Sequence, residues 1–228
     1  SLWVVEDAAQ AIDSYYNGKP LGSIGHLAAF SFHETKNIIS GEGGMLAIND
    51  ERFIKKAEII REKGTNRSAF FRGEIDKYGW VSLGSSFLPS EIISAFLYAQ
   101  LERLDEIQNR RKWLWQRYWK ELYEPLKNKG IQFPRFIEGA SNNAHMFYLV
   151  CKSLEQRTTL LKELKDAGIW AVFHYLSLHK SPYFKGKHSG NELPWSDHYM
   201  NCLVRLPLFY ELKENEQDLI IANLLNLL

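Results

Sequence analysis

Residues 31–44 read SFHETKNIISGEGG, and this stretch decides how the rest of the chain is interpreted. It begins at the end of an apolar run, residues 27–32, whose length and composition are typical of a β-strand. Lys36 follows that strand in a loop, and the glycines at 41, 43 and 44 let the backbone turn sharply. The stretch therefore predicts a strand, a loop that carries a lysine, a bend and a further strand over residues 43–48.

A second informative segment lies upstream, where residues 5–11 read VEDAAQA. Residues 3–6 predict a strand, which places the carboxylate of Asp7 at its carboxyl end. Gln10 follows three residues later among small side chains. The two segments together offer a carboxylate, an amide, a hydroxyl (Ser31) and an amine (Lys36), each near the end of a predicted strand.

Pyridoxal phosphate (PLP) chemistry requires this set of groups. A lysine amine forms an imine with the cofactor aldehyde. A carboxylate beside the pyridine nitrogen keeps it protonated, so that the ring withdraws electrons. The phosphate needs hydroxyls, backbone N–H groups or a helix N-terminus. We therefore predict Lys36 as the catalytic lysine, Asp7 as the partner of the ring nitrogen, Gln10 beside the ring oxygen and Ser31 as a phosphate ligand.

Bulk composition is that of a water-soluble globular protein. The chain has 228 residues, 45% of them hydrophobic, and a formal net charge of +1. Its Lys and Arg residues are scattered, which argues against a nucleic-acid partner, and its apolar runs are too short to span a bilayer. Cys151 and Cys202 form neither a disulfide framework nor a metal-type cluster. No signal peptide precedes the first strand pattern, so we expect a cytoplasmic protein, and one cut from something longer.

The order of patterns predicts an α/β architecture followed by a second unit. The first part alternates strands with a helix over residues 50–64, which Asp50 can cap. Residues 65–89 lack periodicity, and a long helix follows from Pro89 and Ser90. After Pro125 we expect strands at 145–151, 169–174 and 204–208, helices at 156–167 and 214–228, and a loop at 180–195.

The long helix carries a group of tryptophans, at 113, 115 and 119. They form either a base-stacking platform or the packing face of the helix, and large aromatic residues favour packing. Arg111 interrupts the apolar stripe of the same helix.

The two motif segments resemble those of the DegT/StrS-type sugar aminotransferases, and the resemblance extends over essentially the whole chain. It implies the aspartate-aminotransferase fold (fold type I). Residues 1–107 would form part of the PLP-binding large domain, without its N-terminal portion. Residues 108–228 would form a long connecting helix and a small C-terminal α+β domain. The resemblance also implies a homodimer with shared active sites.

The activity that the resemblance implies is amino transfer from glutamate to a nucleotide sugar. Lys36 would hold PLP, and the amine would pass to the 4-keto carbon of a dTDP-linked 4-keto-6-deoxy sugar. The segment 80–91 and the pair His174-Tyr175 support this substrate class. Many relatives carry Asn-Tyr-Arg where this chain has residues 86–88, and Ser86 would replace that Asn as a ligand of the neighbouring subunit's phosphate.

Several residues have two interpretations. His33 is a substrate-contacting base or a histidine packed beside the cofactor. His174 and Tyr175 contact the sugar nucleotide or serve the fold. Arg205, just before Leu206-Pro207, holds a carboxylate or diphosphate or lies on the surface.

Three other functions compete with this prediction. A related sugar dehydratase would carry histidine in place of Lys36. A nucleotide-binding oxidoreductase would need a glycine spacing that residues 41–44 do not show. An inactive fragment that only dimerises is the third.

Overall fold

The computed structural model describes residues 2–228, which divide into two compact units. The first comprises the residues up to 108 with 139–143, and the second comprises 109–138 with 144–228. The chain contains both helices and strands, which is consistent with the predicted α/β fold. The identification of residues 1–107 as a PLP-binding domain and 108–228 as a connecting helix with a small domain stays a prediction.

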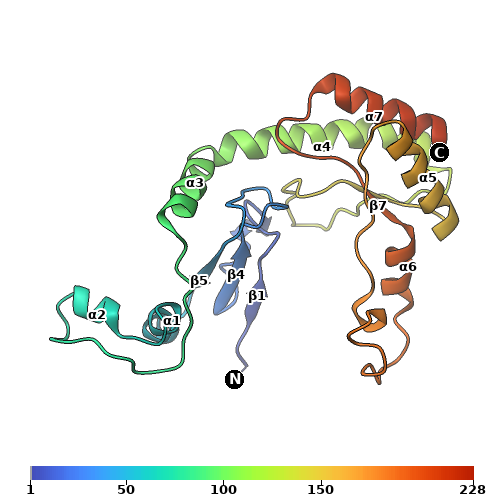
Figure 1. Ribbon diagram of the computed structural model, residues 1–228. Coiled ribbons are helices and arrows are strands. Elements are labelled where there is room, and N and C mark those ends of the chain that lie inside the picture. The colour runs from blue at the N-terminus through green and yellow to red at the C-terminus, as the bar shows by residue number, and fades with distance from the viewer. Residues whose placement is uncertain (1) are drawn as a thin grey trace. The chain divides into compact units, whose positions relative to one another are not determined.

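The first unit is built on a three-stranded sheet (Figure 1). Its order is β1 (Val5–Asp7), β4 (Leu27–Ser31) and β5 (Gly44–Ile48), and all three lie within two residues of the predicted strands. β1 and β4 run parallel, whereas β4 and β5 run antiparallel. The carboxyl ends of β1 and β4 therefore meet at one edge of the sheet.

A tight hairpin connects β1 to β4. It pairs β2 (Tyr15–Tyr16) with β3 (Lys19–Pro20). Asn17 and Gly18, at its turn, have φ angles of 48° and 76°. Two successive positive φ values are typical of a type I′ turn, for which Asn-Gly is the preferred sequence. The turn predicted at this position is confirmed.

The carboxylate of Glu6 fixes β1 to the chain that precedes β4. It accepts hydrogen bonds from the backbone N–H groups of Gly22 (2.7 Å), Ile24 (2.7 Å) and Gly25 (2.6 Å). Burial alone would raise the pKa of Glu6, but the three N–H donors together lower it below its usual value. Glu6 therefore contributes stability in its ionised form.

We expect Glu6→Gln to lower the free energy of unfolding by about 1–2 kcal/mol at neutral pH, because charged hydrogen bonds are lost. The pKa of Glu6 is lower in the folded state, so its contribution is lost as pH falls through that value. The deficit of the variant should therefore be smaller at a pH well below the ordinary pKa of glutamate than at neutral pH. Denaturant unfolding at both pH values measures it, with the exposed Glu51→Gln as control. A deficit of equal size at both pH values would contradict the charge-based explanation.

The segment after β5 begins with η1 (Glu51–Phe53) and α1 (Ile54–Arg61). Asp50 caps the first turn through the N–H of Arg52, as predicted. The chain then crosses itself closely, because a Cβ on Gly84 would lie 2.2 Å from the backbone nitrogen of Gly64. This crossing shapes the region predicted to be irregular, which also contains one short helix, α2 (Arg67–Phe71).

The long helix predicted from Ser90 is two helices. Ser90 caps α3 (Glu91–Glu102), and α4 (Leu104–Lys127) follows directly. The break falls at Arg103, whose backbone leaves the helical region with φ −107° and ψ 17°. The apolar spacing continues across it, so periodicity alone did not reveal the break.

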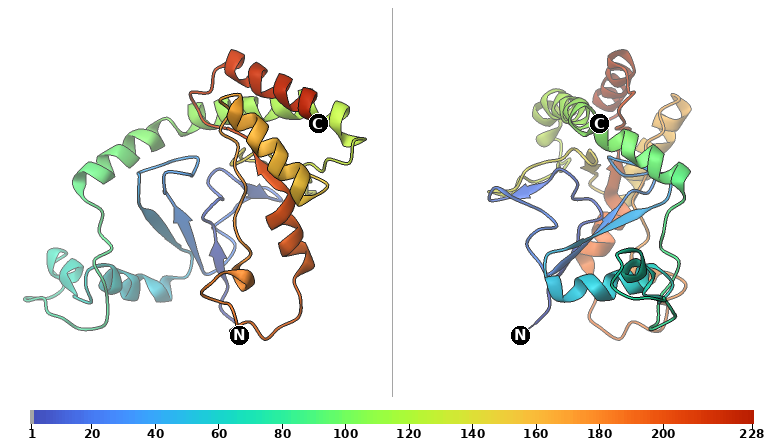
Figure 2. Two further views of the ribbon diagram at one scale, coloured as in Figure 1. Left: turned by 45° about the vertical axis from the view of Figure 1, so that its right-hand side comes forward. Right: turned by 90° about the vertical axis from the view of Figure 1, so that its left-hand side faces the viewer.

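The second unit pairs β6 (Tyr148–Val150) with β7 (Leu203–Arg205) in an antiparallel ladder. Its helices are α5 (Leu154–Asp166), η2 (Leu178–Lys180), α6 (Pro194–Cys202) and α7 (Glu214–Leu227). In both views of Figure 2, α7 lies along the later part of α4, and Gln217 donates to the carbonyl of Leu114 (2.8 Å). One sheet face, with Leu149 and Val204, is fully buried in the core.

Two features of α4 that the sequence left open are resolved. Trp115 is 5% exposed and stacks on Trp119, with ring centroids 5.6 Å apart. Packing is therefore the interpretation that the structure supports. Arg111 is also buried, and it donates to the carbonyls of His145 (2.8 Å), Ala144 (3.1 Å) and Leu208 (3.3 Å).

The strand predicted at 169–174 is wrong, because only Val172 forms a β-bridge there, with Arg205. The loop predicted at 180–195 ends early. Pro194 occupies the first turn of α6, a position that suits its missing N–H. None of the helices within residues 2–228 has the length and apolar character needed to cross a membrane.

Candidate active site

The carboxyl ends of β1 and β4 bring Asp7 and Ser31 to one face of the sheet. Asp7 pairs with Ala29 in the parallel register, and Ser31 lies two residues further along β4. Because side chains alternate along a strand, Asp7, Ala29 and Ser31 share a face. Ala28, on the opposite face, is fully buried, whereas Ala29 and Asp7 are exposed. Two of the predicted cofactor ligands thus lie together on an open face.

Lys36 lies in the turn that follows β4, as predicted. Its backbone N–H donates to the carbonyl of His33 (2.9 Å), and its side chain is partly buried. The His33 ring is 3.0 Å from the hydroxyl of Thr35 and 3.7 Å from the carboxylate of Glu42. His33 therefore contacts its own loop, and both interpretations of this residue stay predictions.

The loop is anchored by Asn37, a residue that the sequence did not single out. Asn37 is buried and donates to the side chain of Gln108 (2.8 Å) and to the carbonyl of Asn143 (2.7 Å). Asn143 in turn donates to the carbonyls of Gln10 (2.8 Å) and Ile12 (2.9 Å). One buried amide network therefore fixes both the lysine loop and the turn that carries Gln10. In the sequence, only the position of Asn37 next to Lys36 pointed to a role in the site.

The groups at this sheet end fit PLP. The Asp7 carboxylate accepts one N–H, from Ala9 (3.1 Å), and forms no ion pair within residues 2–228. Its charge is therefore available to a protonated ring nitrogen. Ala29 and Gly44, the latter paired with Ser31, carry almost no side chain on this face. They add little bulk beside the carboxylate and the hydroxyl, and Leu46, the partner of Ala29 on β5, also lies on this face.

The side chains of the other predicted site residues make no hydrogen bond or ring contact with Asp7, Ser31 or Lys36 in the described part of the chain. The side chain of Gln10 is exposed, and only its carbonyl is bound. Ser86 forms a β-bridge with Glu62 at the end of α1. His174 and Tyr175 belong to the second unit, where their rings lie 4.1 Å apart. The roles of all four stay predictions.

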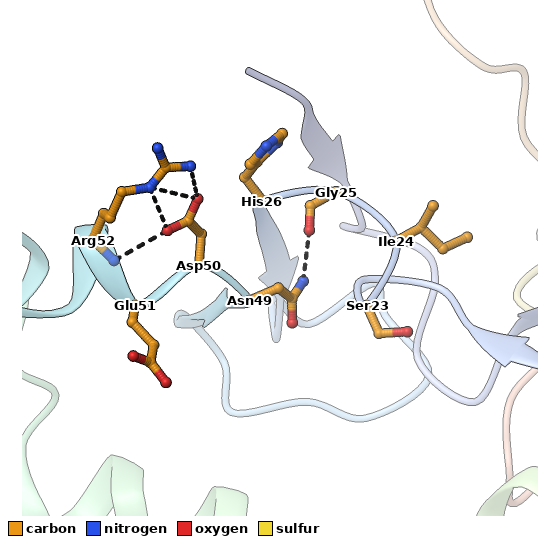
Figure 3. A pocket seen from close by; sticks show the side chains of 8 residues that line it. All are labelled: Ser23, Ile24, Gly25, His26, Asn49, Asp50, Glu51 and Arg52. Atoms are coloured by element: carbon orange, nitrogen blue, oxygen red, sulfur yellow. Dashed lines mark hydrogen bonds and ion pairs between the residues drawn. The ribbon is translucent and has the colours of Figure 1, made fainter. Parts of the chain in front are cut away.

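A hollow at the other end of β4 is a separate feature (Figure 3). Residues 23–26 and 49–52 line it, before β4 begins and after β5 ends. Asn49 donates to the carbonyl of Gly25 (3.0 Å), and Arg52 pairs with Asp50 (2.5 Å), so these three side chains already have partners. Across the described chain, no three His, Cys, Asp or Glu side chains are arranged to hold a metal ion.

Comparison with known proteins identifies the family of this chain. Residues 1–225 match the DegT/DnrJ/EryC1/StrS aminotransferase family. The chain is 31% identical over 226 residues to the pleiotropic regulatory protein of Geobacillus stearothermophilus, covering 98% of this chain and 57% of that protein. It is 29% identical over 229 residues to the spore coat polysaccharide biosynthesis protein SpsC of Bacillus subtilis, covering 96% and 58%.

A solved structure gives the same result for the fold. The PMP-form of the sugar aminotransferase Spr1654 from Streptococcus pneumoniae superposes with a TM-score of 0.86 at 26% identity. The match covers 99% of this chain and 59% of that one, so the chain spans less than two thirds of its relatives' length. Sequence and fold together show that the chain belongs to the DegT/DnrJ/EryC1/StrS aminotransferase family.

Proposed function

We propose that this protein is a PLP-dependent sugar-nucleotide aminotransferase. It would move an amino group from glutamate to the 4-keto carbon of a dTDP-linked 4-keto-6-deoxy sugar. The observation that carries the proposal is the parallel pairing of β1 with β4. This pairing sets Asp7 and Ser31 on one open face, directly before the loop of Lys36. The family match and the aminotransferase structures support the same reaction class.

Each of the four predicted cofactor-site residues has a defined role in this proposal. PLP, when bound, supplies an electron sink for the carbanion that amino transfer creates. The Nζ of Lys36 holds the cofactor and then moves the proton to and from the reacting carbon. The Asp7 carboxylate keeps a proton on the ring nitrogen. The Ser31 hydroxyl binds the phosphate, and the Gln10 amide binds the ring oxygen.

The remaining predictions concern partners. A homodimer would let Ser86 reach the phosphate of the neighbouring subunit, and His174 and Tyr175 would contact the sugar nucleotide. Within the family, the segment 80–91 resembles the transaminase that makes dTDP-4-amino-4,6-dideoxygalactose for enterobacterial common antigen. We extend the proposal to that substrate, dTDP-4-keto-6-deoxyglucose, and to lipopolysaccharide-related biosynthesis in the cytoplasm. SpsC, a relative, carries a name from polysaccharide biosynthesis.

A substrate panel tests the proposal. Purified protein, PLP and glutamate are incubated with several nucleotide keto sugars, and the products are identified by mass spectrometry and NMR. We expect amination of the dTDP-linked 4-keto-6-deoxy sugar and formation of 2-oxoglutarate in equal amount. Amination of a 3-keto sugar instead would keep the enzyme class and replace the substrate. No 2-oxoglutarate with any member of the panel would contradict the proposal.

A further inference from the structure

Arg205 occupies the middle of the small sheet in the second unit. It pairs with Tyr148 of β6 on one side and exchanges two backbone hydrogen bonds with Val172 on the other, 2.7 and 3.1 Å long. Its neighbours in sequence, Val204 and Leu206, are buried in the core. Side-chain alternation therefore points Arg205 to the opposite face, together with Tyr148. Both side chains are partly buried there.

This face carries the positive charge of Arg205. Among the described residues, no carboxylate forms an ion pair with Arg205 or with the neighbouring Arg111. Arg111 donates hydrogen bonds to three backbone carbonyls. Burial and the positive charge of Arg205 lower the pKa of Arg111. A third cation, Arg135, acts on Tyr148. A half-buried guanidinium without an anion is costly, and an anionic ligand would remove that cost.

The surroundings of Arg205 supply neutral donors for such a ligand. Burial raises the pKa of Tyr148, so its hydroxyl keeps its proton at neutral pH. Tyr175, which acts electrostatically on Arg205, is 67% exposed, and its ring is tilted by 43° against that of His174. A guanidinium fork flanked by phenol hydroxyls matches the oxygens of a carboxylate or a phosphate.

We propose that Arg205, with Tyr148 and Tyr175, forms a binding site for a carboxylate or phosphate group on the second unit. This inference rests on the proposed function for the source of the anion. In an aminotransferase of this class, the source is the carboxylate of the amino donor or the diphosphate of the nucleotide sugar. Arg205 is then a residue that determines specificity for one of the two substrates.

Isothermal titration calorimetry tests the site without any turnover. The probes are glutarate, which has the carboxylates of glutamate but no amine, and dTDP. We expect Arg205→Gln to raise the Kd for one probe roughly 10- to 100-fold, as for the loss of a charged hydrogen bond. Arg205→Lys keeps the charge but not the fork, and it should recover only part of the affinity. A loss for glutarate identifies the donor, and a loss for dTDP identifies the nucleotide.

The controls separate binding from folding. Lys120→Gln removes one exposed charge from α4 and should leave both Kd values unchanged. Arg205→Gln should not lower the free energy of unfolding, because it removes a half-buried charge without a partner. Tyr148→Phe offers a milder variant that deletes only a hydroxyl.

The inference is overturned if neither probe shows affinity that depends on Arg205, or if Lys120→Gln loses affinity equally. The substrate panel decides the proposed function independently. A protein that aminates no keto sugar but binds one probe through Arg205 would refute the function and keep the site.

Discussion

Replacing Lys36 with alanine is expected to abolish covalent capture of PLP and to reduce amino transfer by at least roughly a thousandfold. The amine is both the attachment point and the group that moves the proton, so one substitution removes both. Borohydride reduction in the presence of PLP, followed by peptide mass analysis, should locate the cofactor on Lys36 in the wild-type protein. The same treatment should leave the Lys36→Ala protein unlabelled.

A lysine on the surface of α1 provides the matched control. Lys56 is exposed, and Lys56→Ala should retain both the label on Lys36 and the rate of amino transfer. Thermal unfolding of the two variants should be similar, because the Nζ of Lys36 makes no hydrogen bond in the described chain. A Lys36→Ala protein that turns over glutamate at the normal rate would end the proposed mechanism.

The strands of the site could be predicted from local sequence because each is a short apolar run between turn residues. Asp7 at the end of β1 and Lys36 in the loop after β4 followed from those runs alone. The direction and order of the strands did not follow. The register that sets Asp7 beside Ala29 depends on backbone hydrogen bonds between segments more than 20 residues apart. No local pattern encodes such a pairing.

Buried polar residues were the least predictable part of the site. Asn37 reads locally as a loop residue, yet its partners lie 71 and 106 residues away. Arg111 looks like an interruption of an apolar stripe, and its role depends on three carbonyls that come close only in the folded unit. Such residues are satisfied by distant groups, and the sequence shows only that they break the pattern.

The predictions of one continuous helix and of a strand at 169–174 were wrong for a different reason. The apolar spacing that favours one helix from Ser90 onward is present in both α3 and α4, and the break at Arg103 changes the backbone without changing the spacing. The strand expected at 169–174 has β-favouring residues but gains only one bridge, at Val172. For the 169–174 segment, pairing with distant strands decided the conformation, because β-propensity depends strongly on context.

Two adjacent carboxylates at the end of β1 have different hydrogen-bond partners, and we propose different roles for them. The Glu6 carboxylate accepts hydrogen bonds from three backbone N–H groups and stabilises the sheet. Asp7 alternates to the open face and accepts only the N–H of Ala9. Substitution of a residue that stabilises the fold should change the free energy of unfolding. Substitution of a residue that binds the cofactor should change the rate of amino transfer. Substitutions that exchange carboxylate for amide can therefore separate the two tasks.

Asp7→Asn is expected to slow amino transfer from glutamate by about 10- to 1,000-fold, because an adjacent opposite charge shifts the pKa of a group by about 1–3 units. The neutral amide would hold the proton on the ring nitrogen less well, so the pKa of that nitrogen falls. The protonated form then returns as pH is lowered, and the rate of the variant should rise toward acidic pH. Single-turnover measurements across a pH series give both quantities.

Glu6→Gln is the control for this experiment, since it makes the same chemical change one residue away on the other face. It should lower the free energy of unfolding and leave the rate per folded molecule near the wild-type value. Asp7→Asn should slow the reaction and leave the free energy of unfolding near the wild-type value. The N–H of Ala9, which donates to the Asp7 carboxylate, can donate to an amide oxygen as well. If Asp7→Asn keeps the wild-type rate and pH profile while PLP still binds, then the carboxylate at the end of β1 does not face the ring nitrogen. The geometric basis of the proposed function would then be wrong, whatever the family of the chain.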